Sequence, residues 1–201
     1  RVGNDIKQCS DGGFIVAGSS NKDAYLFKTD RNGNLLWEKK FGGGGYDKAS
    51  SVQICSDGGF IVAGRSASSS SSSYDAYLFK TDRNGNLLWE KKFGGADNEA
   101  QVSSVQICSD GGFIVAGSAN NDAYLFKTDR NGIQSWYVLL DYSDLHTTSS
   151  ETISNVQICS DGGYVMTGSH LIKTNTKGEV YEVTLTDRIT SYVEAKVNIW
   201  Q

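Results

Sequence analysis

Residues 23–43 read DAYLFKTDRNGNLLWEKKFGG, and residues 75–95 repeat this stretch letter for letter. The first eleven residues of the stretch appear a third time at residues 122–132. A second motif, Ser-Asp-Gly-Gly, occurs four times at intervals of 46, 53 and 51 residues, with its aspartate at Asp11, Asp57, Asp110 and Asp161. The chain therefore consists of four copies of one unit, and we expect each copy to fold alike.

Four short strand patterns follow one another within each copy. In the second copy they cover residues 52–55, 60–63, 76–80 and 87–93. Asn84-Gly85, between the last two, is a strong hairpin signal because both residues tolerate positive φ. The second pattern is apolar on both faces, whereas the fourth is more polar, as expected for an exposed edge. Each copy thus predicts a four-stranded antiparallel sheet.

A sheet with two apolar faces cannot be stable alone, so the copies must stack radially into a propeller or linearly into a solenoid. A period near fifty residues with four strands favours the propeller. We predict an all-β fold: a four-bladed β-propeller of four-stranded antiparallel blades with one extra C-terminal strand. It forms a single domain over residues 1–201, with blades at about 1–43, 44–95, 96–141 and 142–187.

The extra strand is expected within residues 192–201, where Val197–Trp200 matches the first strand of a further copy. It could cover an edge of the ring, begin a fifth blade or pair with another molecule. Because the chain starts with Arg1 rather than Met, we expect a processed product or a part of something longer.

Residues 24–37 resemble the tryptophan-docking motif of quinoprotein-type (PQQ-like) β-propellers. The shared features are a small residue that opens the strand, an aspartate, a turn glycine and, four residues later, Trp37. The motif recurs with Trp89 and Trp136, and the resemblance implies that these three side chains pack between neighbouring blades. The fourth copy departs, because Glu182 replaces the tryptophan and Asn175 the aspartate. Kelch repeats have a similar period, but their double glycine after the second strand is missing.

Composition limits the classes of partner. The net charge of −4 and the pI near 5.2 give no basic patch of the kind that binds nucleic acid. No apolar run approaches the roughly 20 residues that a membrane-spanning helix needs. Proline is absent and glycine occurs 23 times, so tight turns must be built from Gly, Asn, Asp and Ser.

The cysteines occupy one repeat position, at the end of the first strand of each copy: Cys9, Cys55, Cys108 and Cys159. We favour buried free thiols, because free cysteine commonly behaves as a small buried hydrophobe. Disulfides and a tetrahedral site with four thiolate ligands stay open as alternatives. Residues 30–34 resemble a calcium loop, but their glycine stands fourth rather than sixth, which favours a hairpin turn. We predict no cofactor and no metal.

Catalytic motifs are not recognisable in the sequence. The two histidines, His146 and His170, lie outside the repeated positions and accompany no nucleophile motif. The glycine run at residues 42–45 lacks the Lys-Ser/Thr of a phosphate-binding loop. We therefore expect a protein that is not an enzyme.

The connections between the second and third strands, and those between copies, differ from one copy to the next. Alternating strand direction places both kinds at the same end of the blades, where binding residues commonly lie. The candidate binding residues on this variable face are Tyr46, Ser68, Ser73, Tyr74, Tyr142 and His146. The serine run is most simply a flexible spacer, with O-glycosylation as an alternative.

We expect a non-enzymatic extracellular or cell-surface scaffold for protein interaction or self-assembly, including a filament subunit that joins by strand addition. Its partners would be other protein chains or further copies of itself. One alternative is a module that binds carbohydrate or another small ligand, with glycans as partners. Another is a fragment of a larger quinoprotein-like enzyme.

Overall fold

The structure is a computed structural model that describes residues 1–67, 73–94, 100–140, 152–168, 171–184 and 196–199. The regular elements of these ranges are β-strands, and none of the described residues forms a helix that could cross a membrane. The chain divides into two compact units, Arg1–Val105 and Gln106–Gln201.

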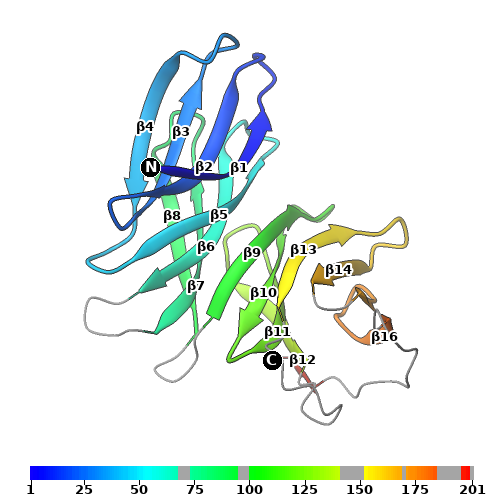
Figure 1. The fold of residues 1–201 in the computed structure, drawn as a ribbon. Helices are drawn as coiled ribbons and strands as arrows, with labels where there is room; N and C mark the ends of the chain where they lie inside the picture. The colour runs from blue at the N-terminus through cyan, green and yellow to red at the C-terminus, as the bar shows by residue number, and fades with distance from the viewer. Residues whose placement is uncertain (68–72, 95–99, 141–151, 169–170, 185–195, 200–201) are drawn as a thin grey trace. The chain divides into compact units, whose positions relative to one another are not determined.

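Unit 1 holds two antiparallel sheets whose strands follow chain order (Figure 1). Each sheet is one blade. Blade 1 consists of β1 (Val2–Gln8), β2 (Phe14–Ser20), β3 (Asp23–Thr29) and β4 (Leu35–Phe41). Blade 2 consists of β5 (Asp47–Ile54), β6 (Phe60–Ala67), β7 (Tyr74–Thr81) and β8 (Leu87–Phe93).

Two further sheets complete the described chain. Blade 3 consists of β9 (Ala100–Ile107), which runs across the boundary between the units, β10 (Phe113–Ala119), β11 (Asp122–Thr128) and β12 (Gln134–Leu140). Blade 4 consists of β13 (Ile153–Ile158), β14 (Tyr164–Gly168), β15 (Leu171–Thr174) and β16 (Val180–Thr184). The predicted four sheets are therefore confirmed, and the blade and domain limits drawn from the sequence stay predictions.

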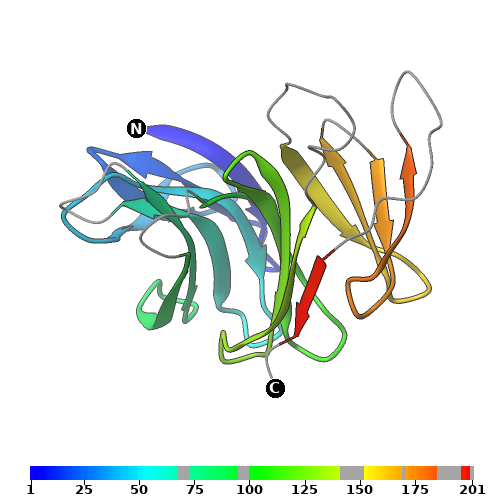
Figure 2. The same cartoon turned by 90° about the horizontal axis from the view of Figure 1, so that it is seen from below.

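The extra C-terminal strand is β17 (Lys196–Ile199). It pairs antiparallel with β12 and places Ile199 opposite Trp136, so that blade 3 has five strands (Figure 2). The sequence left three roles open for this strand. The structure shows that it covers the outer edge of blade 3 in its own chain.

The turn between the first two strands of each blade is built by the Ser-Asp-Gly-Gly motif. In blade 1, Oδ1 of Asp11 accepts the N–H of Gly13 at 2.9 Å, and Gly12 has a φ of 83°. A Cβ at position 13 would lie 2.2 Å from the carbonyl oxygen of Thr29 on β3. The first glycine therefore provides the left-handed backbone and the second allows the neighbouring strand to approach.

The turn between the third and fourth strands differs from the type that Asn-Gly predicts. In blade 2 only Gly85 of the pair has positive φ, 77°, and its N–H donates to the carbonyl of Asp82 at 3.1 Å. The register of the ladder shifts between Lys80 and Thr81. This is the longer hairpin with a bulge, whereas two successive residues with positive φ occur at Asn21-Lys22.

A β-bulge in the first strand of the blade explains a repeated glycine in the second. In blade 2 the register shifts between Ala49 and Ser51, and a Cβ on Gly64 would lie 1.8 Å from the carbonyl oxygen of Lys48. Gly18 and Gly168 have the same relationship to Val2 and Thr152. The bulge requires glycine on the partner strand because the two backbones come too close for any side chain.

The apolar cores lie between successive sheets within each unit. In unit 1, Ile15, Ala17 and Leu26 of blade 1 form a buried cluster with Val62 and Phe79 of blade 2. In unit 2, Ile114, Leu125 and Trp136 of blade 3 form one with Met166 and Ile172 of blade 4. Each pair of blades therefore buries one face of each sheet against the other, as the repeat predicts.

Candidate interaction site

The variable connections of unit 1 meet at one end of blades 1 and 2. The N–H of Asp47 donates to the carbonyl of Lys22 at 2.6 Å, and the N–H of Ala67 donates to the carbonyl of Tyr46 at 3.0 Å. Residues 42–46 are thereby tied to the β2–β3 turn of blade 1 and to the end of β6 in blade 2. We call residues 21–22 and 42–46, together with Arg65 and Tyr74, the loop end of unit 1.

Two tyrosines at the loop end each lie beneath a cation. Nζ of Lys22 lies 4.7 Å from the centroid of the Tyr46 ring, and the Arg65 guanidinium carbon lies 4.2 Å from that of Tyr74. Arg65 also donates to Oε1 of Gln101 at 2.7 Å. Tyr46 is 56% exposed, and Tyr74 is half-buried.

A buried carboxylate organises the glycine run of the loop end. Asp47 is 3% exposed, and its Oδ2 accepts the N–H of Gly43 at 2.9 Å. Gly42 has a φ of 116°, and a Cβ there would lie 2.1 Å from Oδ2 of Asp47. A Cβ on Gly45 would lie 2.4 Å from the carbonyl oxygen of Ala67. The run is therefore a close-packed loop with a fixed path.

The structure brings together only some of the predicted binding residues. Tyr46 and Tyr74 belong to the loop end, and Ser73 lies directly before β7 and is half-buried. Ser68, Tyr142 and His146 lie outside the described residues. The binding role of all six stays a prediction.

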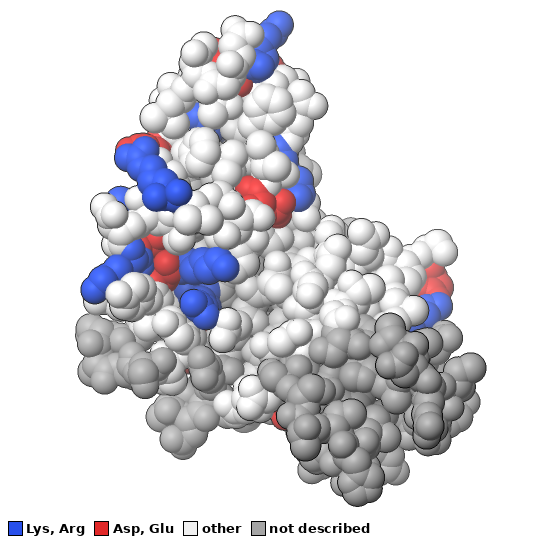
Figure 3. Space-filling view, viewed as in Figure 1, with Lys and Arg blue, Asp and Glu red and all other residues white. Residues whose placement is uncertain are grey.

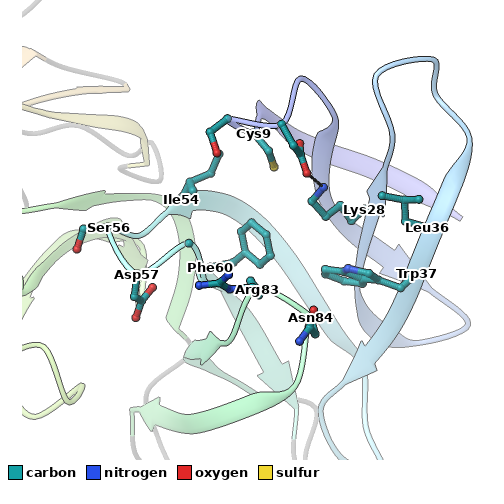
Figure 4. Close-up of a pocket in the computed structure, with 13 residues that line it drawn as sticks. Cys9, Lys28, Leu36, Trp37, Ile54, Ser56, Asp57, Phe60, Arg83 and Asn84 are labelled. Carbon is teal, nitrogen blue, oxygen red and sulfur yellow. Dashed lines mark hydrogen bonds and ion pairs between the residues drawn. The ribbon is translucent and has the colours of Figure 1, made fainter.

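The opposite end of blades 1 and 2 contains a cavity of about 530 Å³ that sequence reasoning missed (Figure 4). Trp37 and Phe60 line it with apolar surface, and Lys28, Asp57 and Arg83 add charged groups. These residues belong to the turns and strand ends that are nearly identical between copies, so the sequence indicated only a structural role. The signal that could have found the cavity is the gathering of charged turn residues around a docked tryptophan.

A repeated ion pair stabilises the turns at this end of the blades. Nζ of Lys28 on β3 contacts the Asp11 carboxylate, and Lys80 with Asp57, Lys127 with Asp110 and Lys173 with Asp161 repeat the pair. The hydrogen bond from the lysine, together with the N–H of the second turn glycine, lowers the pKa of each aspartate. Each turn thus keeps a charged carboxylate at neutral pH, joined to a largely buried lysine in the first three blades.

The repeat tryptophans contact the following blade where both partners are described within one unit. The centroid of the Trp37 ring lies 6.0 Å from that of the Phe60 ring, and the indole covers Gly85. Phe60 and Gly85 both belong to blade 2. The Trp136 ring lies 5.9 Å from that of Tyr164 and covers Gly178, both of blade 4. Trp89 is half-buried on β8.

The fourth copy keeps the architecture of the motif despite its substitutions. Lys173 pairs with Glu182 in the same register in which Lys28 pairs with Trp37. Oδ1 of Asn175 accepts the N–H groups of Lys177 and Glu179 at 2.9 and 3.0 Å, as Oδ1 of Asp30 accepts those of Asn32 and Asn34. The turn therefore needs a side-chain oxygen rather than a negative charge.

The cysteines follow the first strand of each blade and are free thiols. Cys9, Cys55 and Cys108 are buried, and burial raises the pKa of each, that of Cys55 to about 11. Cys159 is half-buried. Among the described residues, no three His, Cys, Asp or Glu side chains are grouped as metal ligands would be.

No protein-family model and no curated protein sequence matches the chain. Solved structures resemble it in fold. The WD40 domain of Neurospora crassa Pan2 has a TM-score of 0.62 and 10% identity over 90% of this chain and 49% of that one. The fold is that of a β-propeller. The quinoprotein-type subclass stays a prediction.

Two further structures share this propeller fold. One is assigned as a gluconolactonase, with a TM-score of 0.56 and 11% identity over 89% of this chain and 61% of that one. The other is PorZ, a bacterial surface component of the type-IX secretion system of Porphyromonas gingivalis, with a TM-score of 0.57 and 11% identity over 92% of this chain and 27% of that one. The chain thus spans about half the length of the Pan2 domain and less than two-thirds of the other two.

The gluconolactonase structure corrects one expectation from the sequence. We expected a protein that is not an enzyme because linear catalytic motifs are missing. A propeller assigned as an enzyme contradicts that inference. The physical reason is that a propeller can bring side chains together from separate blades, so a catalytic set need not form a motif along the chain.

Proposed function

We propose that the chain is a protein-interaction scaffold that contacts its partner through the loop end of unit 1. The observation that carries the proposal is the pair of cation-covered tyrosines, Tyr46 with Lys22 and Tyr74 with Arg65. Tyrosine and arginine are enriched in protein interfaces, and a ring held by a cation loses little side-chain freedom on binding. The loop beneath them is fixed by Asp47, so the surface is formed before a partner arrives.

Sequence differences between the copies also favour this end of the blades as the binding surface. Residues 23–43 and 75–95 are identical, whereas the connections that follow β2 and β6 have different lengths and composition. A constant framework that carries differing loops is typical of propellers and other scaffolds that bind through loops.

The location of the protein is also part of the proposal. We place it outside the cell or at the cell surface, where PorZ, a structure with the same fold, is a component of a secretion system. Self-assembly is a more specific version of the proposed scaffold function. The pairing of β17 with β12 inside the chain illustrates how an outer strand of a blade accepts a further strand.

The test is affinity capture from the source organism with the full chain and two matched variants. The double variant Tyr46→Ser/Tyr74→Ser removes both cation-covered rings at the loop end. Leu88→Ser removes an apolar side chain of β8 that is 55% exposed and lies outside the loop end. The proposal expects a captured protein that the double variant loses at least tenfold and that Leu88→Ser retains. Equal capture by all three chains contradicts it.

A further inference from the structure

A buried carboxylate and a buried hydroxyl lie opposite each other in blade 2, beneath the loop end of unit 1. Asp47 on β5 pairs in register with Ser66 on β6, and Ser66 pairs with Asp75 on β7. Residues directly opposite in an antiparallel ladder project from one face of the sheet, with Cβ atoms about 5 Å apart. This face also carries Val62 and Phe79, which blade 1 covers within the same unit.

Two oxygens of this row have no hydrogen-bond partner in the described chain. Asp47 is 3% exposed and Ser66 is 0% exposed. Oδ2 of Asp47 accepts the N–H of Gly43, but Oδ1 of Asp47 and Oγ of Ser66 bond neither to each other nor to another described residue. Buried polar atoms are nearly always paired, and a buried carboxylate is costly unless a cation accompanies it. The row therefore offers two oxygens to a bound cation.

The third residue of the row lacks the lysine that its equivalent in blade 1 has. Figure 3 shows acidic and basic side chains together on the surface of unit 1, and Asp23 on β3 forms such an ion pair with Lys40 at 2.9 Å. In blade 2, Nζ of the corresponding Lys92 lies over the Tyr77 ring, 5.9 Å from its centroid. Within the described chain, no Lys or Arg forms an ion pair with Asp75. The row thus holds a second carboxylate that the chain leaves unneutralised.

Blade 3 has alanine at the positions of both buried oxygens. Ala100, eight residues before the cysteine of its copy, corresponds to Asp47. Ala119, opposite the aspartate that begins β11, corresponds to Ser66. Both alanines are buried. Small apolar side chains therefore suit these positions of the repeat, and the sheet does not need the carboxylate and the hydroxyl of blade 2 in order to form.

We propose that Asp47, Ser66 and Asp75 bind one calcium ion on the covered face of blade 2. Calcium takes about six to eight oxygen ligands, and two carboxylates balance its charge. Magnesium suits the row less well, because it usually keeps several waters and the row is largely buried. Since one of the three side chains is a hydroxyl, the site differs from a cluster of three His, Cys, Asp or Glu ligands, which the described residues lack.

The ion would hold the glycine run of the loop end through Asp47. The carboxylate already accepts the N–H of Gly43, and a Cβ on Gly42 would lie 2.1 Å from its Oδ2, so the loop follows the carboxylate closely. A cation that fixes Asp47 would therefore stabilise both the loop end and unit 1. The proposal concerns the ion alone and does not require that the loop end bind a protein.

The test uses the full chain, dialysed against EDTA and then titrated with CaCl2 in a calorimeter. We expect one calcium ion per chain with a Kd below about 1 mM. Because the ion binds the folded state, about 10 mM CaCl2 should raise the melting temperature by at least about 3 °C. The same concentration of MgCl2 should give less than about a third of that rise.

Variants assign the binding to the row. Asp47→Ala/Ser66→Ala, which carries the residues of blade 3, should bind calcium at least about tenfold more weakly, because it loses a charged ligand. Asp75→Asn should also bind at least about tenfold more weakly, and it is the test if the double variant does not fold. Asp23→Asn, the matched position in blade 1, should bind like wild type.

Three results would overturn the proposal: no calcium binding by the folded wild-type chain, undiminished binding by the folded variants of the row, or an equal response to MgCl2. These measurements need no partner protein, so a failure here is distinct from a failure to capture a partner through the loop end.

Discussion

Trp37 lies so close to Gly85 that a Cβ at position 85 would stand 2.7 Å from Cζ3 of the indole. The same distance separates Cζ3 of Trp136 from a Cβ on Gly178. Two physical constraints thus require glycine in each of these two turns. The backbone has a positive φ, and the edge of an indole ring from the preceding blade leaves no space for a Cβ. The sequence alone indicates only the first.

The two reasons can be separated by the variants Gly33→Asn and Gly85→Asn. The two turns have the same sequence and similar φ values, 85° and 77°, but among the described residues an indole lies against Gly85 and none lies within 4 Å of a Cβ on Gly33. We expect Gly33→Asn to cost little and Gly85→Asn to lower the free energy of unfolding by about 1–3 kcal/mol more, as overpacking does. Urea denaturation measures both. Equal losses would show that the backbone conformation alone requires glycine.

The ion pair between Lys80 and Asp57 gives stability a pH dependence. Lys80 and the N–H of Gly59 lower the pKa of Asp57, so the carboxylate stabilises the folded chain above its unfolded pKa of about 3.9. That contribution is lost as the pH falls through the lower, folded value. Asp11, Asp110 and Asp161 should behave alike, since their pKa values are lowered by equivalent lysines.

The variant Lys80→Met tests whether this ion pair causes the pH dependence of stability. Because Asp57 is 56% exposed at its side chain, the variant should lose no more than about 1 kcal/mol at pH 7. Its free energy of unfolding should also fall less steeply than that of wild type between pH 5 and about pH 2, which urea denaturation in steps of pH measures. Lys91→Met on the exposed outer strand is the control. If the free energy of unfolding depends on pH equally in Lys80→Met and wild type, the ion pair is not the origin of the pH dependence.

The natural turn with Asn175 predicts how the aspartate turns respond to substitution. Asp82 accepts from Nδ2 of Asn86 at 2.8 Å, whereas Nδ2 of Asn175 donates to Glu179 at 2.5 Å. In the single variant Asp82→Asn, the amide group of the new side chain would face the Nδ2 donor of Asn86, so two donors would meet. The variant should therefore have a lower urea midpoint. Adding Asn86→Glu recreates the pair of the fourth blade and should restore most of that midpoint. A double variant that is less stable than Asp82→Asn contradicts this assignment.

Cysteine reactivity should follow burial. Burial raises the pKa of the Cys55 thiol to about 11, so at pH 8 very little of it is present as the reactive thiolate. Cys159 is the least buried of the four, so it should react first with a thiol reagent, at least about tenfold faster than the other three. Cys159→Ser should remove the fast phase. A uniform rate, or fewer than four thiols in denaturant, is incompatible with this arrangement.

Repetition made the sheets predictable. Once the Ser-Asp-Gly-Gly motif and the stretch from Asp23 to Gly43 were seen to recur, four strands per copy followed from alternation and turn residues. The bulge in the first strand was missed because Gly18 and Gly64 look like ordinary strand residues in one dimension. Their requirement appears only when the carbonyls of Val2 and Lys48 are placed opposite them.

The candidate site was predictable only in part. Tyr46 and Tyr74 could be assigned to one end of the blades from strand direction, but their cations, Lys22 and Arg65, could not, because each pair depends on side-chain direction at the end of a strand. The cavity beside Trp37 was missed because its lining residues lie in turns and strand ends that are nearly identical in most copies, which indicated a structural role. The expectation that the protein is not an enzyme rested on missing linear motifs, which a propeller does not need.

Hydrogen exchange in the wild-type chain measures the unequal packing of blades 1 and 2 most directly. Residues 14–18 and 60–64 both read FIVAG, and β3 and β7 share DAYLFKT, so differences in exchange report packing rather than sequence. Because Ile6 is 55% exposed and Val16 and Phe27 are half-buried, amides of β2 and β3 should exchange at least about tenfold faster than those of β6 and β7. Equal protection of the two pairs of strands would contradict this difference in packing between blades 1 and 2.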